Sequence, residues 1–200
     1  MAEPFTRLTA PAAALLRDNI DTDIIIPSRE MKTVGKTGLA AGLFANWRYT
    51  DVAARTPNPD FVLNQRPNAR VLLAGANFGC GSSREHAAWA LAEWGIRTVI
   101  APSFNPIFFG NAVRNGIVPV RLPADTIARL EAAEQLTVDL EAMRVEGQGE
   151  AHAFELPDEA RLMLLEGLDA IDLTLKFRAD IEAWRAADRG ARDQQHQSQL

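Results

Sequence analysis

Residues 71–86 read VLLAGANFGCGSSREH and contain the signals of a buried strand, a glycine-rich turn and the beginning of a helix. The apolar run 71–74 predicts the strand, and the pattern from Ser83 to Trp94, closed by Gly95, predicts the helix. The glycines therefore lie at a strand-to-helix turn, where they let a ligand approach the backbone closely. Because unpaired N–H groups at a helix start attract anions, we expect this turn to bind a carboxylate or a phosphate.

Ser82 has two interpretations at this turn. With Glu85 three residues later it fits a capping box, in which its hydroxyl only satisfies a backbone N–H. Alternatively it belongs to a functional group with Cys80, Ser83 and Arg84, since a cap needs only one of these residues. The spacing excludes the dinucleotide fingerprint and the serine-hydrolase elbow, because Arg84 occupies a position where each requires glycine.

The composition is that of an ordinary globular protein, with 200 residues, 47% hydrophobic and 24% charged. A formal net charge of −5 with scattered basic residues argues against a nucleic-acid partner. The sequence shows neither an apolar run of membrane-spanning length nor an N-terminal signal peptide. We therefore expect a cytoplasmic protein with no membrane partner.

The metal-binding residue types are sparse and far apart. Cys80 is the single cysteine, and His86, His152 and His196 are widely spaced, so they form no recognisable zinc or iron–sulfur ligand set. We expect no metal and no cofactor bound by this chain. Cys80 is either a reactive thiol, activated by the helix start and Arg84, or a small residue packed in a tight turn.

Strand and helix signals alternate along the chain, which predicts an α/β fold. Strand-type segments fall at 13–16, 24–26, 71–74, 98–101, 117–120, 137–140, 143–146 and 151–156. Helical patterns fall at 83–94, 104–115, 125–134 and 158–166. The three strand segments within 137–156 predict an antiparallel hairpin or meander added to a more parallel core.

Two segments lack a clear period. Residues 27–42 mix charges and glycines, and we interpret them as a mobile loop. Residues 186–200 are polar and rich in glutamine, which is typical of a frayed end. The predicted organisation is a single domain over 1–185 followed by a polar, disordered tail over 186–200.

The SSREH motif at 82–86 and the sequence NIDTDIIIP at 19–27 resemble the small subunits of 3-isopropylmalate dehydratase, the detached swivel domain of the aconitase superfamily. Further similar segments follow in the family's order at 57–64, 100–104, 110–111 and 167–175. The resemblance covers about residues 5–185, far more than a chance motif would. It implies a single swivelling-type β/β/α domain with a mixed sheet, as in the aconitase C-terminal domain.

The resemblance implies a hydro-lyase activity that is divided between two chains. The family interconverts 2-isopropylmalate and 3-isopropylmalate through a dehydrated alkene in leucine biosynthesis. A 4Fe-4S cluster, held by three cysteines of a separate large subunit, helps hydroxide leave. The chain would then be active only with that large subunit, as a heterodimer or heterotetramer acting on a small dicarboxylate.

The resemblance also assigns roles to residues of the glycine-rich turn. Ser82 would be the catalytic base, and Gly81, Ser83 and Arg84 would bind a substrate carboxylate. Arginine suits that role because its planar guanidinium binds a carboxylate through two hydrogen bonds.

Asp23 matches an acidic residue of the family near the active site, where it would orient or tune a catalytic group. The alternative is a local turn or helix cap within the acidic segment 18–23. Lys32 and Lys36, in the segment 27–42, are the expected loop contacts to substrate. His86 is predicted to pack or to hydrogen-bond rather than to catalyse.

Four aromatic residues near the turn are predicted as core rather than substrate contacts. These are Trp89, Trp94, Phe108 and Phe109.

The loop departs from the usual pattern of the family. Glu30-Met31-Lys32 stands where an aromatic residue and a leucine commonly precede the lysine, and Lys36 stands in place of an arginine. Since this loop is expected to touch the variable side chain of the substrate, citraconate, dimethylmalate or homoaconitate stay open as alternatives. A non-catalytic binding module, with Ser82 only a helix cap, is the third possibility.

Overall fold

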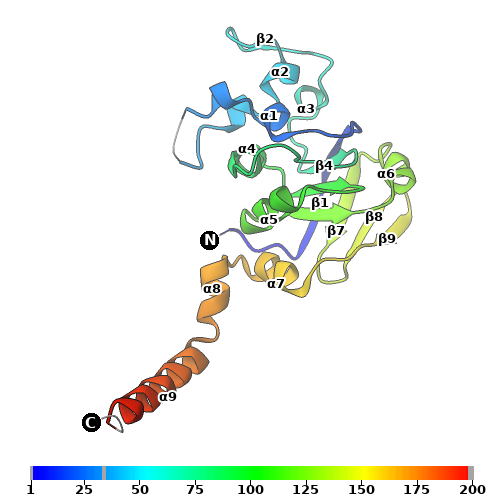
Figure 1. Ribbon diagram of the computed structural model, residues 1–200. Helices are drawn as coiled ribbons and strands as arrows, with labels where there is room; N and C mark the ends of the chain where they lie inside the picture. Colours follow the sequence, from blue (N-terminus) through cyan, green and yellow to red (C-terminus); the bar gives the residue numbers. More distant parts are fainter. Residues whose placement is uncertain (1, 33–34, 198–200) are drawn as a thin grey trace.

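The fold is built on a seven-stranded mixed sheet of order β6-β5-β4-β1-β7-β8-β9 (Figure 1). The computed structural model describes residues 2–32 and 35–197, with side chains up to residue 188. The strands are β1 Arg7–Leu15, β4 Val71–Ala74, β5 Thr98–Ala101, β6 Val118–Arg121, β7 Gln135–Asp139, β8 Arg144–Gly147 and β9 Glu150–Ala153. A separate pair, β2 Tyr49–Asp51 and β3 Thr56–Pro57, forms a small hairpin.

Strand β1 joins the two halves of the sheet. It runs parallel to β4, with Ala12 opposite Val71, and antiparallel to β7, with Thr9 opposite Thr137. Strands β4, β5 and β6 continue the parallel half, whereas β7, β8 and β9 form an antiparallel meander. The predicted α/β class, with a meander added to a parallel core, is confirmed.

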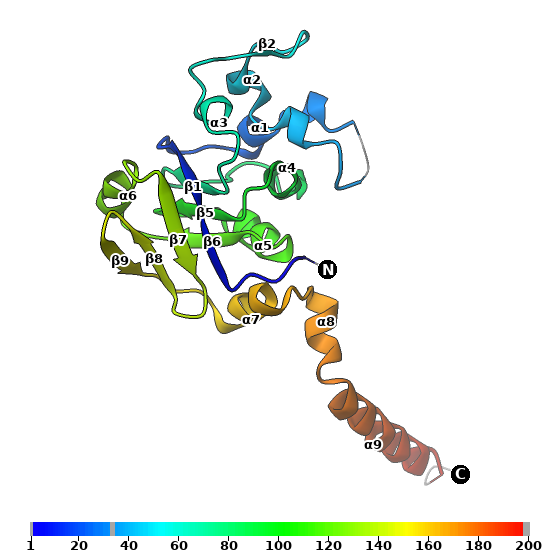
Figure 2. The same cartoon turned by 180° about the vertical axis from the view of Figure 1, so that it is seen from behind.

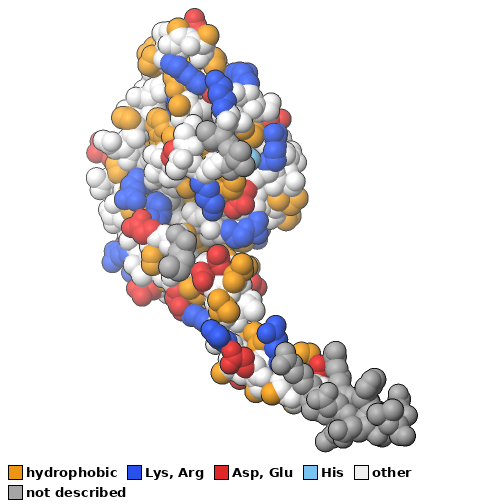
Figure 3. Space-filling model, turned by 90° about the vertical axis from the view of Figure 1, so that its left-hand side faces the viewer, with side chains coloured by type: hydrophobic (Ala, Val, Ile, Leu, Met, Phe, Trp, Pro, Cys, Tyr) orange, Lys and Arg blue, Asp and Glu red, His pale blue; other side chains and the backbone are white. Residues whose placement is uncertain are grey.

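The helices lie between the strands along the chain and after the last strand. They are α1 Thr22–Ile25, α2 Ala45–Arg48, α3 Val62–Gln65, α4 His86–Trp94, α5 Pro106–Arg114, α6 Ala124–Leu130, α7 Asp158–Glu166, α8 Ala170–Leu175 and α9 Arg178–Gln197, with short 3-10 turns η1 Ser28–Glu30 and η2 Ala40–Gly42. Helices α8 and α9 extend away from the body (Figures 1 and 2). Hydrophobic side chains are exposed on this arm (Figure 3), including Ile171, Phe177 and Trp184.

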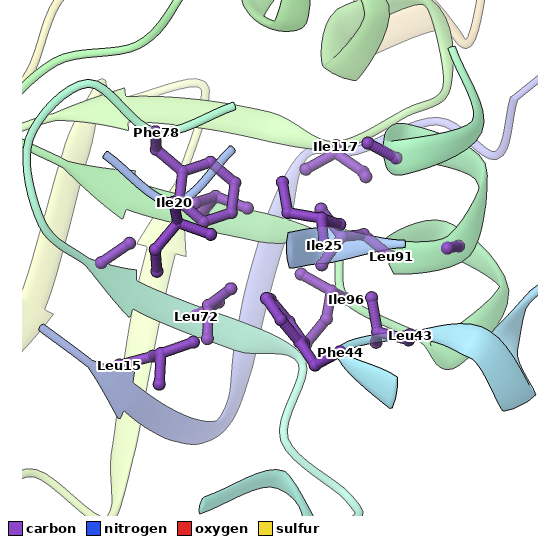
Figure 4. Close-up of a cluster of buried hydrophobic side chains, with 14 of the residues drawn as sticks. Leu15, Ile20, Ile25, Leu43, Phe44, Leu72, Phe78, Leu91, Ile96 and Ile117 are labelled. Atoms are coloured by element: carbon purple, nitrogen blue, oxygen red, sulfur yellow. The ribbon is translucent and has the colours of Figure 1, made fainter. Parts of the chain in front are cut away.

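The two faces of the sheet carry separate hydrophobic clusters, because successive side chains of a strand point to opposite faces. In β4, Leu72 belongs to the cluster under α1 and α4, whereas Val71 and Leu73 belong to the cluster under α6 and α7. Figure 4 shows the first cluster, in which Ile25 and Leu91 lie among buried side chains from several elements. Since β4 is buried on both faces, its sequence is a continuous apolar run rather than an alternating one.

The structure corrects two predicted elements near the site. Residues 24–26, predicted as a strand, mostly form helix α1, because the Asp21 carboxylate accepts a hydrogen bond from Ile24 N at 2.7 Å and begins a helix there. The helix predicted from Ser83 begins three residues later, at His86. Ser82 and Ser83 therefore lie in the turn and not in the helix.

The two chain ends differ in their contacts. Near the N-terminus, Phe5 N donates to Leu164 O at 2.9 Å, and Arg97 pairs with Glu3. At the other end, α9 spans residues 178–197, so residues 186–197 of the predicted disordered tail are helical. The domain boundary at residue 185 stays a prediction. Thr33 and Val34 of the predicted mobile loop lie outside the described residues.

Candidate active site

The glycine-rich turn lies at the carboxyl ends of β1, β4 and β5, the edge of a parallel sheet where α/β proteins bind ligands. It is held between the segments that follow the neighbouring strands. Gly79 N donates to Ile20 O at 2.8 Å, and Phe78 N donates to Ser103 O at 3.0 Å. The site is thus formed where three strand ends meet.

Two glycines of the turn are required by its geometry. Gly79 has φ 74°, and a Cβ there would lie 2.2 Å from the Phe108 ring. Gly81 has φ 98°, and a Cβ there would lie 3.2 Å from Thr22 Oγ1. A larger residue at either position would strain the backbone and displace the hydroxyl that follows. The positive φ of both glycines and the close approach of Phe108 and Thr22 explain why glycine stands at these positions, whereas the predicted approach of a ligand stays a prediction.

Ser82 does not cap helix α4. Its Oγ accepts hydrogen bonds from Arg84 N at 3.3 Å and from Arg84 Nε at 3.0 Å, not from Glu85 N–H. Glu85 is the residue at the N-cap, and it makes no side-chain cap bond. Instead its carboxylate accepts from Asn115 Nδ2 at 2.6 Å. The capping-box interpretation is therefore wrong, and the hydroxyl of Ser82 faces a guanidinium.

Arg84 links the two predicted catalytic residues. Its Nε donates to Ser82 Oγ, and its Nη2 donates to Asp23 Oδ1 at 3.2 Å. The third guanidinium nitrogen, Nη1, lies 3.5 Å from Met31 Sδ. Arg84 and Asp23 are both exposed, and Ser82 is half-buried. The arrangement places a hydroxyl, a cation and a carboxylate side by side at an accessible surface.

The three aspartates of segment 18–23 make different contacts. Asp21 caps α1, and Asp18 accepts from Ala76 N at 2.7 Å. Asp23 does neither, since its carboxylate pairs with Arg84. The alternative that Asp23 serves as a cap or a turn residue is thus replaced by an ion pair within the site.

Further polar residues hold the turn in place. The hydroxyl of Thr22, a buried residue, accepts from Ser82 N at 2.9 Å, so it fixes the backbone beside the predicted base. Asn111, 3% exposed, donates to Ser83 O at 3.4 Å. Sequence reasoning did not identify these positioning roles. The available signals were the position of Thr22 between Asp21 and Asp23 and the place of Asn111 in a segment similar to the family.

The two predicted loop lysines lie apart in the structure. Lys36 Nζ donates to Asn115 Oδ1 at 3.1 Å, and Asn115 in turn bonds Glu85, the residue after Arg84. Lys32 is exposed and lines a hollow of about 460 Å³ together with Arg29 and Arg55. Lys36 is thus connected to the turn through Asn115 and Glu85, whereas Lys32 lines a separate hollow that also contains Glu30.

The departure of the loop from the family pattern has a structural counterpart. Glu30, which stands where the family commonly has an aromatic residue, is 8% exposed and accepts from Arg55 Nη2 at 2.5 Å. This pairing raises the pKa of the Arg55 guanidinium above its ordinary value, chiefly through the hydrogen bond to Glu30. The buried carboxylate is thus paired with a cation, as burial of a charge requires.

Cys80 has the environment of a structural residue. Its carbonyl accepts from Thr22 N at 2.8 Å, and its side chain is half-buried. Burial, and then the nearby Asp21 carboxylate, raise the pKa of the Cys80 thiol. A raised pKa keeps the sulfur neutral, which is the opposite of a reactive thiolate. This environment favours the packing interpretation of Cys80.

His86 and the four aromatic residues pack as predicted. The His86 ring contacts the Trp89 ring at a centroid distance of 4.7 Å, and its buried Nδ1 has no hydrogen-bond partner among the described residues. Phe108 is 2% exposed in the core, and Trp89, Trp94 and Phe109 pack against the same cluster.

Within residues 2–32 and 35–188, no group of three or more His, Cys, Asp and Glu residues is placed to hold a metal ion. No helix in the described part of the chain is long and apolar enough to cross a membrane.

A hydroxyl, a guanidinium and a carboxylate at the carboxyl ends of parallel strands are typical of the class of α/β domains that bind a ligand at this edge of the sheet. The face of the molecule seen in Figure 3 carries several groups of Lys and Arg interspersed with acidic side chains.

Comparisons with known proteins specify the family. The model of the aconitase C-terminal domain matches residues 2–125. A 3-isopropylmalate dehydratase small subunit from Cupriavidus necator is 56% identical over 197 residues, covering 94% of this chain and 95% of the relative. One from Rhodospirillum centenum is 52% identical over 196 residues, covering 94% and 96%. The crystal structure of a 3-isopropylmalate dehydratase from Methanocaldococcus jannaschii has a TM-score of 0.66 at 28% identity, covering 90% and 99%. The chain belongs to the 3-isopropylmalate dehydratase small subunits of the aconitase C-terminal domain family.

Proposed function

We propose that this chain is the small subunit of a 3-isopropylmalate dehydratase, a hydro-lyase that interconverts 2-isopropylmalate and 3-isopropylmalate in leucine biosynthesis. The observation that carries the mechanism is the guanidinium of Arg84, which contacts both Ser82 Oγ and the Asp23 carboxylate. The reaction is inferred from the family relationship. The roles of Ser82, Arg84 and Asp23 in it are inferred from these contacts.

Ser82 is the proposed base, which takes a proton from the carbon next to a substrate carboxylate and returns it during rehydration. A serine alkoxide is costly at neutral pH unless hydrogen-bond donors stabilise it. Two N–H groups of Arg84, one of them on the cationic guanidinium, already point at Ser82 Oγ. The Thr22 hydroxyl accepts a hydrogen bond from Ser82 N and so holds the backbone of Ser82. The charge that develops on the hydroxyl oxygen therefore meets donors that are in place beforehand.

Arg84 is also the proposed carboxylate ligand, together with Ser83 and Gly81. A guanidinium has five N–H donors, and among the described residues three of them have partners. Asp23 orients the guanidinium and balances its charge. A substrate carboxylate is proposed to bind the remaining donors in the planar, two-bond arrangement that arginine favours.

A large subunit is the proposed partner, and the proposed 4Fe-4S cluster belongs to it. The donor set of this chain does not fit a cluster, because its one cysteine is half-buried with a raised pKa and the described residues contain no ligand group. The removal of hydroxide is therefore assigned to no residue of this chain. Whether the assembly is a heterodimer or a heterotetramer, and its cytoplasmic location, stay predictions.

A related hydro-lyase acting on another 2-hydroxy acid is the alternative. The observation that favours it is the ion pair between the buried Glu30 of the loop and the half-buried Arg55, next to a methionine that contacts Arg84. This replaces the aromatic residue and leucine common in the family at the place expected to face the variable side chain of the substrate.

The test is reconstitution. The chain is co-expressed with a large subunit of the family, purified, and assayed by the gain of alkene absorbance with isopropylmalate and dimethylmalate and by its loss with citraconate and homoaconitate, which are already alkenes. We expect the highest kcat/KM with isopropylmalate and no turnover by either subunit alone. Dehydration by the small subunit alone would contradict the proposed division of labour, and a preference for another acid would favour the alternative.

A further inference from the structure

Three consecutive backbone N–H groups point at one carboxylate on helix α4. Gly38 N donates to Glu93 Oε1 at 2.6 Å, and Leu39 N and Ala40 N donate to Glu93 Oε2 at 2.5 and 2.7 Å. These residues form the end of the loop that follows η1. Glu93 lies in the last turn of α4, far from them in the sequence.

The interaction is of a strong type. Hydrogen bonds from N–H groups to a carboxylate are shorter and stronger than those between neutral groups. Burial alone would raise the pKa of Glu93, but the three N–H donations outweigh it, so that the pKa lies below its ordinary value. The carboxylate is therefore ionised at neutral pH, the state that accepts all three bonds.

The same helix carries the active-site turn at its other end. Ser82 and Arg84 directly precede α4, whereas Glu93 is its second-last residue. The front of the loop contacts this turn, because Met31 Sδ lies 3.5 Å from Arg84 Nη1. Glu93 thus connects residues 38–40 of the loop to helix α4, the helix that follows Arg84.

We propose that Glu93 is a positioning residue for the substrate reaction: it fastens Gly38, Leu39 and Ala40 to α4 and so sets the place of Met31 against Arg84. The loop and the active-site turn then keep a fixed separation, and the substrate side chain meets Met31 while its carboxylate meets Arg84. This inference rests on the proposed function, since it assumes that the substrate lies between these two groups.

The first readout needs no substrate. Amide hydrogen exchange of Gly38, Leu39 and Ala40 is measured by NMR in the full small subunit for the wild type, Glu93→Gln and Glu93→Asp. Glutamine loses the charge and turns one acceptor into a donor, whereas aspartate keeps the charge on a shorter side chain. We expect exchange about ten-fold faster in Glu93→Gln and intermediate in Glu93→Asp. Unchanged protection in Glu93→Gln would overturn the proposal at this step.

The second readout is kinetic, in the complex with the large subunit. A misplacement of about 1 Å can cost on the order of 100-fold in rate. We expect Glu93→Gln to lower kcat/KM by about ten- to 100-fold, with the larger part in KM, and to narrow the preference for isopropylmalate over the methyl-bearing citraconate substrate. Glu93→Asp should recover part of the loss. Glu131→Gln, a carboxylate change at the exposed end of α6, is the matched control and should leave kcat/KM unchanged.

These outcomes distinguish a positioning role of Glu93 from a purely structural role. They also distinguish failure of this proposal from an incorrect choice of substrate. If Glu93→Gln lowers only the yield of complex, and kcat/KM and substrate preference per intact complex equal those of the wild type, Glu93 is merely structural and the proposal fails. If the wild-type complex prefers another 2-hydroxy acid, the proposed function changes. The Glu93 variants are then measured with that acid, and the same loss of kcat/KM is expected.

Discussion

At the scale of single residues, the sequence indicated the chemistry of the site but not its internal contacts. Serine, arginine and aspartate types in two motifs were enough to predict an anion-binding turn. The partner of Ser82 could not be predicted, because a capping box and a guanidinium contact share the same local spacing. In the structure the Ser82 hydroxyl contacts Arg84 and does not cap the helix, because α4 begins four residues after Ser82.

Replacing Ser82 with alanine should therefore separate chemistry from stability. We expect kcat to fall by roughly 100- to 10,000-fold, the range of a lost general base. The free energy of unfolding should fall by less than about 0.5 kcal/mol, below the cost of a lost helix cap. Steady-state assays of the complex and urea denaturation of the chain measure the two effects.

Ser103→Ala is the control for Ser82→Ala, since the Ser103 hydroxyl also accepts a backbone N–H in this region, from Asn77. It should keep kcat near the wild-type value. An active Ser82→Ala variant with lowered stability would restore the capping interpretation and remove Ser82 from the mechanism.

Replacing Arg84 with lysine should be damaging although the charge is kept. One ammonium cannot hold Ser82 Oγ, the Asp23 carboxylate and a substrate carboxylate in the plane that a guanidinium provides. We expect kcat/KM to fall about 100-fold in the assembled enzyme, measured against Arg178→Lys as a matched exposed control. Equal kinetics in the two lysine variants would show that the planar group is unnecessary.

At the scale of elements, long or strongly patterned segments were predictable and short ones were not. The strands at 71–74 and 98–101 and the helix at 158–166 have the predicted bounds. The isoleucines at 24–26 read as a strand, but the cap at Asp21 and the buried face of Ile25 make a single helical turn more stable there. Contacts between distant elements, such as Glu93 with the loop, left no signal in a single sequence.

The hydrogen bonds between the Glu93 carboxylate of α4 and the loop should weaken at low pH. The pKa of Glu93 is lowered in the fold, so its contribution to stability is complete above the ordinary pKa of 4.5 and is lost as the pH falls through the lowered value. The stability difference between the wild type and Glu93→Gln should stay constant from about pH 8 to about pH 6 and shrink toward about pH 3. Urea denaturation across this range measures it, and a gap that widens in acid would contradict the assignment.

At the scale of the whole molecule, the site is open where an enclosed enzyme would have a pocket. Gly81, Ser83 and Arg84 are exposed, which agrees with a surface that a second subunit covers. The α/β class and the meander could be predicted from the order of strand and helix patterns. The place of β1 between β4 and β7 could not, because hydrophobic periodicity does not specify which strands are neighbours.

The boundary at residue 185 can be tested by truncation. Removing residues 186–200 leaves the sheet and both hydrophobic clusters intact, since their members all precede residue 174. We expect the thermal midpoint to change by less than about 2 °C, measured by differential scanning calorimetry. A chain that ends at Pro157 also loses α7, with the buried Met163 and Leu164, and should unfold far more readily. A large loss of stability on removing 186–200 alone would move the boundary toward the C-terminus.

The central position of β1 also bears on how the protein is synthesised. This strand is synthesised before both strands that it pairs with, residues 71–74 and residues 135–139. Its edge toward β4 stays unpaired until residues 71–74 are made, and its edge toward β7 until residues 135–139 are made. Such distant pairings form slowly. We expect nascent chains shorter than about 140 residues to expose an unpaired edge of β1 that is prone to aggregation, and to bind chaperones often.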